Sequence, residues 1–574
     1  MIRTALTRAC IFACVAGFLV APSPAQDAAT DMAHLKAQLA DQQSQIQELR
    51  RALEEQKKLL QETIASRSTE NAKDEAKPVD ARTARVSGYG EVASTRPILP
   101  PGVAPIPSAV VNTTLAPPVI SAQGGQTDSA PLQLKIGNAY ITPVGFMDMT
   151  SVSRSTNTGS GIGTNFGSVP YGNTQAGALT ETRLSIQNSR LGARFDSMFG
   201  NTKVLGYWES DFLGQLGAPP NGGLAVSSNP YVFRMRLYWV DVQRNNWEFL
   251  AGQSWSLMTP NRKGVSPLPG DIFFSQDVDV NYQLGLTWGR IPGFRGAYHW
   301  GNKAALAVAL ENSEPYVGGG NGGSASVLPA AISGTANAVS GAVLGGQINN
   351  GNSQIQAASV HPDIIAKLAL DPSSKFHFEI TGVEITNKIA FPGSTPPFAH
   401  FTKAGGGGSI NMNFELVKGL RFITNNYWSS GGGRYIFGQA PDFIIRGDGS
   451  LSLVHSASTV TGLEATIGKT LYYGYYGGVY ISRNLALDAN GKTLIGYGPI
   501  SNDGQNRAIQ EVTFGTNTTL AKDAKWGALN LMFQFSWLQR NPWLVTGTAP
   551  GNAHLEMGFV NLRYTLPGSA PTLK

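Results

Sequence analysis

The stretch RLSIQNSRLGARFDSMFGNTKVLGYWESDFLG, from Arg183 to Gly214, decides the expected fold. Polar and apolar residues alternate one by one from 190 to 196 and again from 203 to 212, on the two sides of a short turn at 199–201. This period of two around a tight turn predicts a β-hairpin. One face is apolar and the other carries arginine, aspartate, glutamate and tyrosine, which is typical of strands that separate lipid from a wet lumen. A half-exposed hairpin of a soluble β-sandwich is the alternative that this stretch alone leaves open.

The same alternation recurs along the chain from Leu132 onward. We expect sixteen strands, at about 141–152, 183–196, 202–213, 231–243, 247–257, 281–290, 303–312, 362–371, 374–387, 405–416, 419–430, 457–469, 471–483, 506–520, 524–541 and 553–566. Short and long connections alternate between them, and no segment has the ~18 uninterrupted apolar residues of a spanning helix. An even strand number with this alternation predicts an all-β transmembrane barrel of about 16 antiparallel strands, with both termini in the periplasm. Such a barrel is wide enough for an aqueous channel.

The composition supports a barrel. Charged residues are 14% of the chain, yet the mean hydropathy is slightly negative. This combination is expected because only every second residue of a barrel strand faces lipid. The chain carries a net charge of +6, of which residues 1–26 contribute +2 and residues 27–131 contribute −2, so the barrel keeps about +6.

The N-terminal sequence predicts an exported protein. A basic start, an apolar run at 9–21 and a following small-residue site indicate that residues 1–25 are a secretory signal peptide. Both cysteines, Cys10 and Cys14, lie inside it. The exported chain is therefore expected to contain no cysteine and to form no disulfide.

A coiled coil is expected next, at residues 30–66. Seam residues repeat in three-four spacing from Met32 to Thr63, with charged residues and glutamine at the outer positions. We expect this helix to associate in the periplasm, with a trimer preferred, whereas one free amphipathic helix is the alternative. Residues 67–131, rich in proline, serine and alanine, are expected to be a tether to the barrel at 132–574.

Strand parity divides the barrel residues into two faces. It places five apolar residues toward lipid: Leu191, Phe195, Val204, Trp208 and Phe212. It places basic residues and a tyrosine toward the lumen: Arg190, Arg194, Lys203, Arg234, Arg236 and Tyr238. Guanidinium groups suit planar carboxylates, and a focused positive field concentrates anions, so we expect these residues to contact an anionic solute. The alternative is that the arginines pair with Glu209, Asp211 and Asp241 and stiffen the wall.

The segment from Met258 to Val280 has the position of a loop that folds inward and narrows a channel. It carries Arg262 and Lys263, which we add to the expected solute-binding residues. Three aspartates follow, Asp271, Asp277 and Asp279. An ordinary outer loop is the alternative interpretation.

Enzymatic functions find no support in the sequence. The histidines are scattered without metal-ligand spacing, and there is no nucleophile elbow. The stretch GLEATIGKT at 462–470 has five residues between its glycines rather than the four of a P-loop. We expect no catalytic residue, metal, cofactor or nucleic-acid partner.

Several strand segments resemble the DcaP-like porins, which are related to the phosphate-selective porins. These are SRLGARF (189–195), GYWESDFLG (206–214), FRMRLYWVD (233–241), FLAGQSW (249–255), ALAVALENSEP (305–315) and HPDIIAKLAL (361–370). The resemblance implies a trimeric outer-membrane channel through which small organic anions, notably dicarboxylates, diffuse passively. The chain departs from the barrel pattern at its end, NLRYTLPGSAPTLK, which lacks a terminal aromatic residue.

Two other functions remain open on the sequence alone. One is a phosphate- or sugar-selective channel. The other is a structural protein whose coiled coil contacts peptidoglycan or another envelope protein, with the barrel as its anchor in outer-membrane lipid.

Overall fold

The computed structural model describes part of the chain. The described residues are 47, 51, 133–214, 231–268, 272–278, 282–319, 323, 325–333, 348, 360–500 and 505–567. The predicted signal peptide at 1–25 and tether at 67–131 lie outside them. Of the predicted coiled coil at 30–66, only Gln47 and Arg51 are described, and both are helical. The chain divides into two units, Met1–Tyr89 and Gly90–Lys574, and all described strands belong to the second unit.

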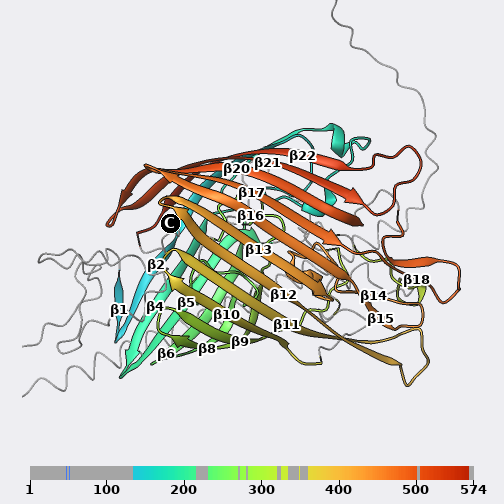
Figure 1. Ribbon diagram of the computed structural model, residues 1–574, viewed down its shortest axis with the longest axis horizontal. Coiled ribbons are helices and arrows are strands. Elements are labelled where there is room, and N and C mark those ends of the chain that lie inside the picture. The colour runs from blue at the N-terminus through green and yellow to red at the C-terminus, as the bar shows by residue number, and fades with distance from the viewer. Residues whose placement is uncertain are drawn as a thin grey trace, which may run out of the picture. The chain divides into compact units, whose positions relative to one another are not determined.

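Sixteen antiparallel strand positions form a closed barrel (Figure 1). In order they are β2 (Ala139–Arg154), β3 (Glu181–Ser185) with β4 (Arg190–Phe199), β5 (Thr202–Gly214), β6 (Val232–Arg244), β7 (Trp247–Trp255), β8 (Arg290–Trp300), β9 (Ala304–Glu311), β10 (Asp363–Ser373), β11 (Phe376–Ala390), β12 (His400–Val417), β13 (Leu420–Ser430), β16 (His455–Ile467), β17 (Thr470–Ile481), β20 (Asn506–Asp523), β21 (Gly527–Pro542) and β22 (Ala553–Thr565). β3 and β4 share one position because both pair with β2. The pairing of β22 with β2 closes the ring. The predicted fold class is confirmed for the barrel.

Smaller elements lie before the barrel and in its connections. They are β1 (Leu134–Ile136), which pairs with β2, η1 (Phe166–Ser168), η2 (Ala176–Ala178), α2 (Ala330–Ser333), η4 (Gly433–Tyr435), the pair β14 (Phe443–Ile445) and β15 (Leu451–Leu453), and the pair β18 (Asn484–Leu487) and β19 (Leu494–Tyr497). None of the described helices has the length and apolar character needed to cross a membrane.

The predicted strand at 281–290 is wrong. The strand at this position is β8, Arg290–Trp300, where a connection was expected at 291–302. Pro292, Gly293 and Gly296 interrupt the alternation of β8 and hide it from a pattern search. The apolar residues of 282–289 alternate for another reason, since Leu284 and Leu286 are buried inside the barrel.

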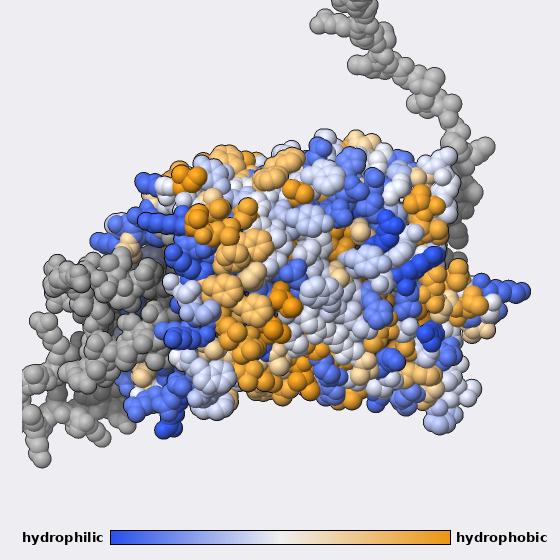
Figure 2. All heavy atoms as spheres, viewed as in Figure 1, coloured by the Kyte–Doolittle hydropathy of each residue, from blue (hydrophilic) through white to orange (hydrophobic). Residues whose placement is uncertain are grey.

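The outer face of the barrel is apolar, as the parity of the first hairpin predicted. Leu191 and Phe195 are exposed on β4, and their directly paired residues on β5 are Ser210 and Gly206. Paired residues share a face, so the even-numbered residues of β5 point outward, including Val204, Trp208 and Phe212. The outward orientation predicted for these five residues is confirmed. Figure 2 shows orange apolar side chains over much of the visible wall.

Candidate functional site

The connection between β7 and β8 folds into the barrel. Its described residues, 256–268, 272–278 and 282–289, form hydrogen bonds with wall strands from β9 to β22. The Gln276 amide donates to Gln534 of β21 at 2.7 Å, the Leu284 amide to Glu511 of β20 at 3.1 Å, and the Thr287 amide to Asn425 of β13 at 3.0 Å. These contacts decide between the two interpretations of this segment, since an ordinary outer loop would not reach the inner wall. We call this segment the inner loop.

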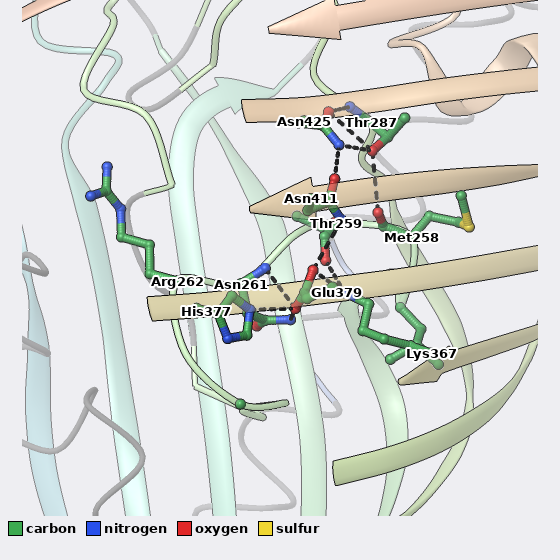
Figure 3. Close-up of polar contacts among 12 residues, drawn as sticks. Met258, Thr259, Asn261, Arg262, Thr287, Lys367, His377, Glu379, Asn411 and Asn425 are labelled. Carbon is green, nitrogen blue, oxygen red and sulfur yellow. Dashed lines mark hydrogen bonds and ion pairs between the residues drawn. The ribbon is translucent and has the colours of Figure 1, made fainter. Parts of the chain in front are cut away.

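A buried polar network fixes the first part of the inner loop to β10 and β11 (Figure 3). Lys367 Nζ donates to the Thr259 carbonyl at 2.7 Å and lies 3.2 Å from the Glu379 carboxylate. The other Glu379 oxygen accepts from the backbone and side chain of Asn261, at 3.1 and 3.0 Å. Both Lys367 and Glu379 are fully buried, so each ion needs the other and the loop dipoles around it.

The same network continues toward the end of β10. His377 Nδ1 lies 2.9 Å from the Asp371 carboxylate, whose other oxygen accepts from the Gly264 amide at 2.8 Å. His377 also lies 3.2 Å from Glu379. The inner loop thus covers four polar side chains of the wall, and all four are buried: Lys367, Asp371, His377 and Glu379.

Two glycines let the inner loop lie directly on β16 and β17. Gly285 has φ +90°, and a β-carbon there would lie 2.4 Å from the Thr459 carbonyl oxygen. A β-carbon on Gly477 of β17 would lie 2.2 Å from the Leu284 carbonyl oxygen. Any other residue at these positions would push the loop from the wall.

Arg262, one of the predicted solute-binding residues, braces the inner loop. It is buried, its guanidinium donates to Glu464 of β16 at 2.7 and 2.5 Å and to the Ile272 carbonyl, and it lies over the Phe274 ring at 4.9 Å. Its neighbour Lys263 is half-buried and makes no ion pair within the described residues.

Asp277 holds the middle of the inner loop. Its carboxylate accepts from Gln534 at 2.6 Å and from Ser536 at 2.9 Å, both on β21. Burial is the largest cause that raises the pKa of Asp277, to about 7. Asp271 and Asp279 lie outside the described residues.

Three of the predicted arginines gather around two carboxylates on the wall of β4, β5 and β6. Arg234 binds Asp211 with two bonds of 3.0 and 2.6 Å. Arg236 bridges Glu209 at 2.8 Å and Asp211 at 2.6 Å, and Arg190 lies 3.7 Å from Glu209. We call these five residues the arginine cluster. The alternative interpretation, in which the arginines pair with carboxylates of the wall, therefore holds for Glu209 and Asp211.

The remaining predicted residues of this wall differ in environment. Arg194 pairs with Asp196 at 2.9 Å on its own strand. Lys203 is buried on the inner face and has no hydrogen bond or ion pair with the part of the chain that the structure describes. Asp241 pairs with Gln243 at 2.7 Å and forms no ion pair with an arginine among the described residues.

Tyr238 does not face the lumen, so that prediction is wrong. Glu209 pairs with Leu237 but the next residue, Ser210, pairs with Met235, which leaves Arg236 as an extra residue. This β-bulge reverses the parity of β6. Arg236 and Leu237 both point inward, and Tyr238 is 61% exposed on the outer face.

Sequence reasoning also missed the inner-loop anchors. Lys367 and Glu379 sit at inward positions of β10 and β11, in the stretches DIIAKLAL and FHFEIT, whose outward residues are apolar. A charged residue at a buried position of such a strand indicates that it has an interaction partner inside the barrel, although the sequence does not identify that partner. Among the described residues, no group of histidine, cysteine or carboxylate side chains could hold a metal ion.

Aromatic residues of three connections meet beside the inner loop. The ring of Phe437 lies 4.3 Å from Tyr282 and 5.2 Å from Trp288, and Phe166 lies 5.9 Å from Tyr282. Trp288 and Phe437 are half-buried. These four residues form an aromatic cluster beside the inner loop.

The geometry defines a closed sixteen-stranded barrel that contains its own loop, and solved structures share this fold. The outer membrane channel DcaP of Acinetobacter baumannii aligns with a TM-score of 0.54 and 15% identity, covering 76% of this chain and all of that one. An anion-selective porin from Comamonas acidovorans aligns with a TM-score of 0.40 and 11% identity, covering 75% of this chain and all of that one. OmpT of Vibrio cholerae aligns with a TM-score of 0.39 and 8% identity, covering 76% of this chain and all of that one. Family models and curated proteins give no match. The resemblance to a DcaP-like barrel is confirmed for the fold.

Proposed function

We propose that this chain is an outer-membrane porin through which small hydrophilic solutes diffuse passively, with a preference for organic anions such as dicarboxylates. The observation that carries the proposal is the inner loop, which crosses the interior of a closed barrel while the arginine cluster occupies the wall of β4 to β6. A loop bonded to the wall narrows the passage without closing the ring of strands. Selectivity then depends on the groups left facing the narrowed passage.

The apolar exterior supports the membrane location. Large apolar side chains are exposed on many strands, for example Phe294 on β8, Leu306 on β9 and Phe533 on β21. A soluble protein would bury such a surface, whereas the hydrocarbon region of a bilayer requires it. The exchange of solutes with the periplasm follows from this placement.

The charge balance of the arginine cluster supports the anion preference. Three guanidiniums face two carboxylates, which leaves one positive charge, while on the same wall the charge of Lys203 is matched by that of the neighbouring Asp241. The Arg234 side chain remains 35% exposed, so part of it is accessible to a passing carboxylate. Paired arginines hold an anion weakly, which suits conduction, because a site that binds too tightly does not release the solute.

Uptake by reconstituted vesicles tests the proposal. Vesicles that contain the protein should admit succinate faster than a neutral solute of equal size. Replacing Arg234 and Lys203 by glutamine should remove most of this difference, whereas Arg507→Gln, at an exposed position near the start of β20, should leave it unchanged. Equal uptake of both solutes by the wild-type protein would contradict the anion preference, and no uptake of either would contradict the porin.

The aromatic cluster favours a second candidate, a sugar-selective channel. Aromatic rings stack on the apolar faces of sugars, and Trp288 and Phe437 are accessible in part. Trp288→Ala should then slow maltose uptake more than succinate uptake. The opposite order, or no change in either, would leave the anion channel as the better account.

A further inference from the structure

The short turns at one end of the barrel carry basic side chains. Six of these turns follow one another around the ring, from the turn between β6 and β7 to the turn between β20 and β21, and each has an exposed lysine or arginine in it or directly beside it. These residues are Arg244, Lys303, Lys375, Lys418, Lys469, Lys522 and Lys525. We call them the basic rim. The short turns lie at the left end of the barrel in Figure 1, and Figure 2 shows hydrophilic side chains along that end.

The basic rim contains little negative charge. Among the described residues of these turns, the one exposed carboxylate is that of Asp523, which accepts from the amides of Lys525 and Trp526 at 2.8 and 3.1 Å. None of the seven basic side chains forms an ion pair within the part of the chain that the structure describes. Together with Asp523 the rim has a net charge of +6 (7 − 1), which equals the net charge of residues 132–574. All other charges of the barrel residues therefore cancel.

The long connections at the opposite end mix the two signs of charge. In the connection between β13 and β16, the exposed Arg446 lies two residues from Asp448. In the connection between β17 and β20, the exposed Lys492 lies four residues from Asp488. The positive excess of the barrel is thus concentrated at the end with the short turns.

Large apolar side chains lie on the outer face next to the basic rim. Trp247, Trp300, Ile467 and Trp526 are each at least half exposed, and each lies within three residues of a basic residue of the rim. Lys525 Nζ lies 5.1 Å from the centre of the Trp526 ring. Tryptophan is enriched where hydrocarbon meets the polar headgroups of a membrane. The basic rim therefore lies at the level of the headgroups when the apolar wall is in a bilayer.

The charges of the basic rim are close enough to act together. Neighbouring strands lie ~4.8 Å apart, so turns that are two strands apart lie roughly 10 Å from each other. This spacing is comparable to the Debye length of about 10 Å at 0.1 M salt, so the fields of adjacent turns overlap. Six of the seven residues are lysines, whose flexible side chains reach a phosphate without a fixed geometry.

We propose that the basic rim binds the headgroups of anionic phospholipids in the leaflet that surrounds the short turns. This rests on the proposed membrane location. Two observations favour a lipid over a solute in the passage. The basic residues stand beside outward apolar side chains rather than among the groups of the inner loop, and the belt extends over six consecutive turns, whereas one small solute would contact a single turn. Clusters of basic residues at a membrane surface attract anionic lipids in this way.

Lipid retention by the full-length protein tests the proposal. The protein is reconstituted in nanodiscs that contain phosphatidylglycerol and phosphatidylethanolamine in equal amounts, and native mass spectrometry counts the lipids that stay bound. The wild-type protein should retain more phosphatidylglycerol. Lys418→Gln with Lys469→Gln and Lys522→Gln should lower the ratio of the two lipids at least about fivefold, because each basic residue beside an anionic surface strengthens binding by about that factor. The same three residues changed to arginine should keep the wild-type ratio.

A matched variant at the other end of the barrel controls for net charge. Arg446→Gln with Arg483→Gln and Lys492→Gln removes three exposed basic residues of the long connections and should leave the ratio unchanged. An unchanged ratio in the rim variant, or an equal loss in both variants, would overturn the proposal. So would a rim variant that keeps its lipid ratio but loses anion preference in reversal-potential measurements, because the rim would then act on the solute. Solute uptake by the wild-type protein reports porin function separately, so failure of the lipid site and failure of the porin remain distinguishable.

Discussion

Replacing Glu464 by glutamine should free the inner loop. Glu464 receives both terminal nitrogens of Arg262, and both side chains are only 4% exposed. The substitution would leave a buried guanidinium without its counter-charge, which costs about 3–5 kcal/mol. Because every 1.4 kcal/mol is a factor of ten, the released form of the loop should gain roughly 100- to 5,000-fold in population. The other anchors, at Glu379 and Asp277, would then have to hold the loop alone.

Hydrogen exchange and single-channel recording together measure this release. Amides of residues 256–268 should exchange faster in Glu464→Gln, and the current should become larger and noisier as the loop leaves the passage. Arg262→Met combined with Glu464→Gln removes both charges, so it should recover most of the wild-type protection. Glu556→Gln, exposed on the outer face of β22, is the control and should change neither signal.

Wild-type exchange and current in Glu464→Gln would refute the reasoning. So would a double variant as perturbed as the single one, because the effect would then come from lost contacts rather than from an uncompensated charge.

Three further predictions concern other parts of the chain. Phe195→Arg places a charge on the lipid face of β4 at a cost of about 2–4 kcal/mol, so less heat-modifiable barrel should form than with Phe195→Leu; equal yields would show that the outward assignment is wrong. The raised pKa of Asp277, about 7 against an ordinary value of 3.8, means that the anchored loop binds a proton more tightly than the released one, so anchoring is strongest below about pH 4 and weakens as pH rises through 7. Exchange of residues 272–278 should therefore increase from pH 5 to pH 8, after correction for intrinsic rates. Because Glu511 bonds to Asp277, the double variant Asp277→Asn with Glu511→Gln should flatten the profile, and an unchanged profile would contradict the assignment. Deleting residues 30–66 should weaken the oligomer in detergent while the barrel stays folded; an oligomer of undiminished stability would place all association in the barrel.

Alternation along the strands was sufficient to predict the barrel, because each strand must be apolar on one side only. The hairpin at 190–212 shows this most directly, since its inward and outward residues follow the predicted parity throughout. Parity failed where the backbone departed from regular pairing. One extra residue at Arg236 turned Tyr238 outward, and nothing in FRMRLYWVD marks that bulge.

The interior of the barrel was less accessible to sequence reasoning. Residues 282–289 alternate as a strand would, but they do so because a loop packs its apolar side chains against an inner wall. The partners of the inner loop are distant in sequence, as in the pair Arg262 and Glu464, 202 residues apart. A single sequence carries no signal for such pairings, although the presence of charges at inward positions shows that partners are needed.

The reversal potential of single channels in a salt gradient tests the central claim most directly. The wild-type protein, reconstituted in a bilayer, should give the sign of an anion-preferring channel. Replacing Arg190, Arg194, Arg234 and Arg236 by glutamine should shift the potential toward cations while the barrel remains folded. A wild-type potential of cation-preferring sign, or a quadruple variant with unchanged anion preference, would contradict the proposed selectivity.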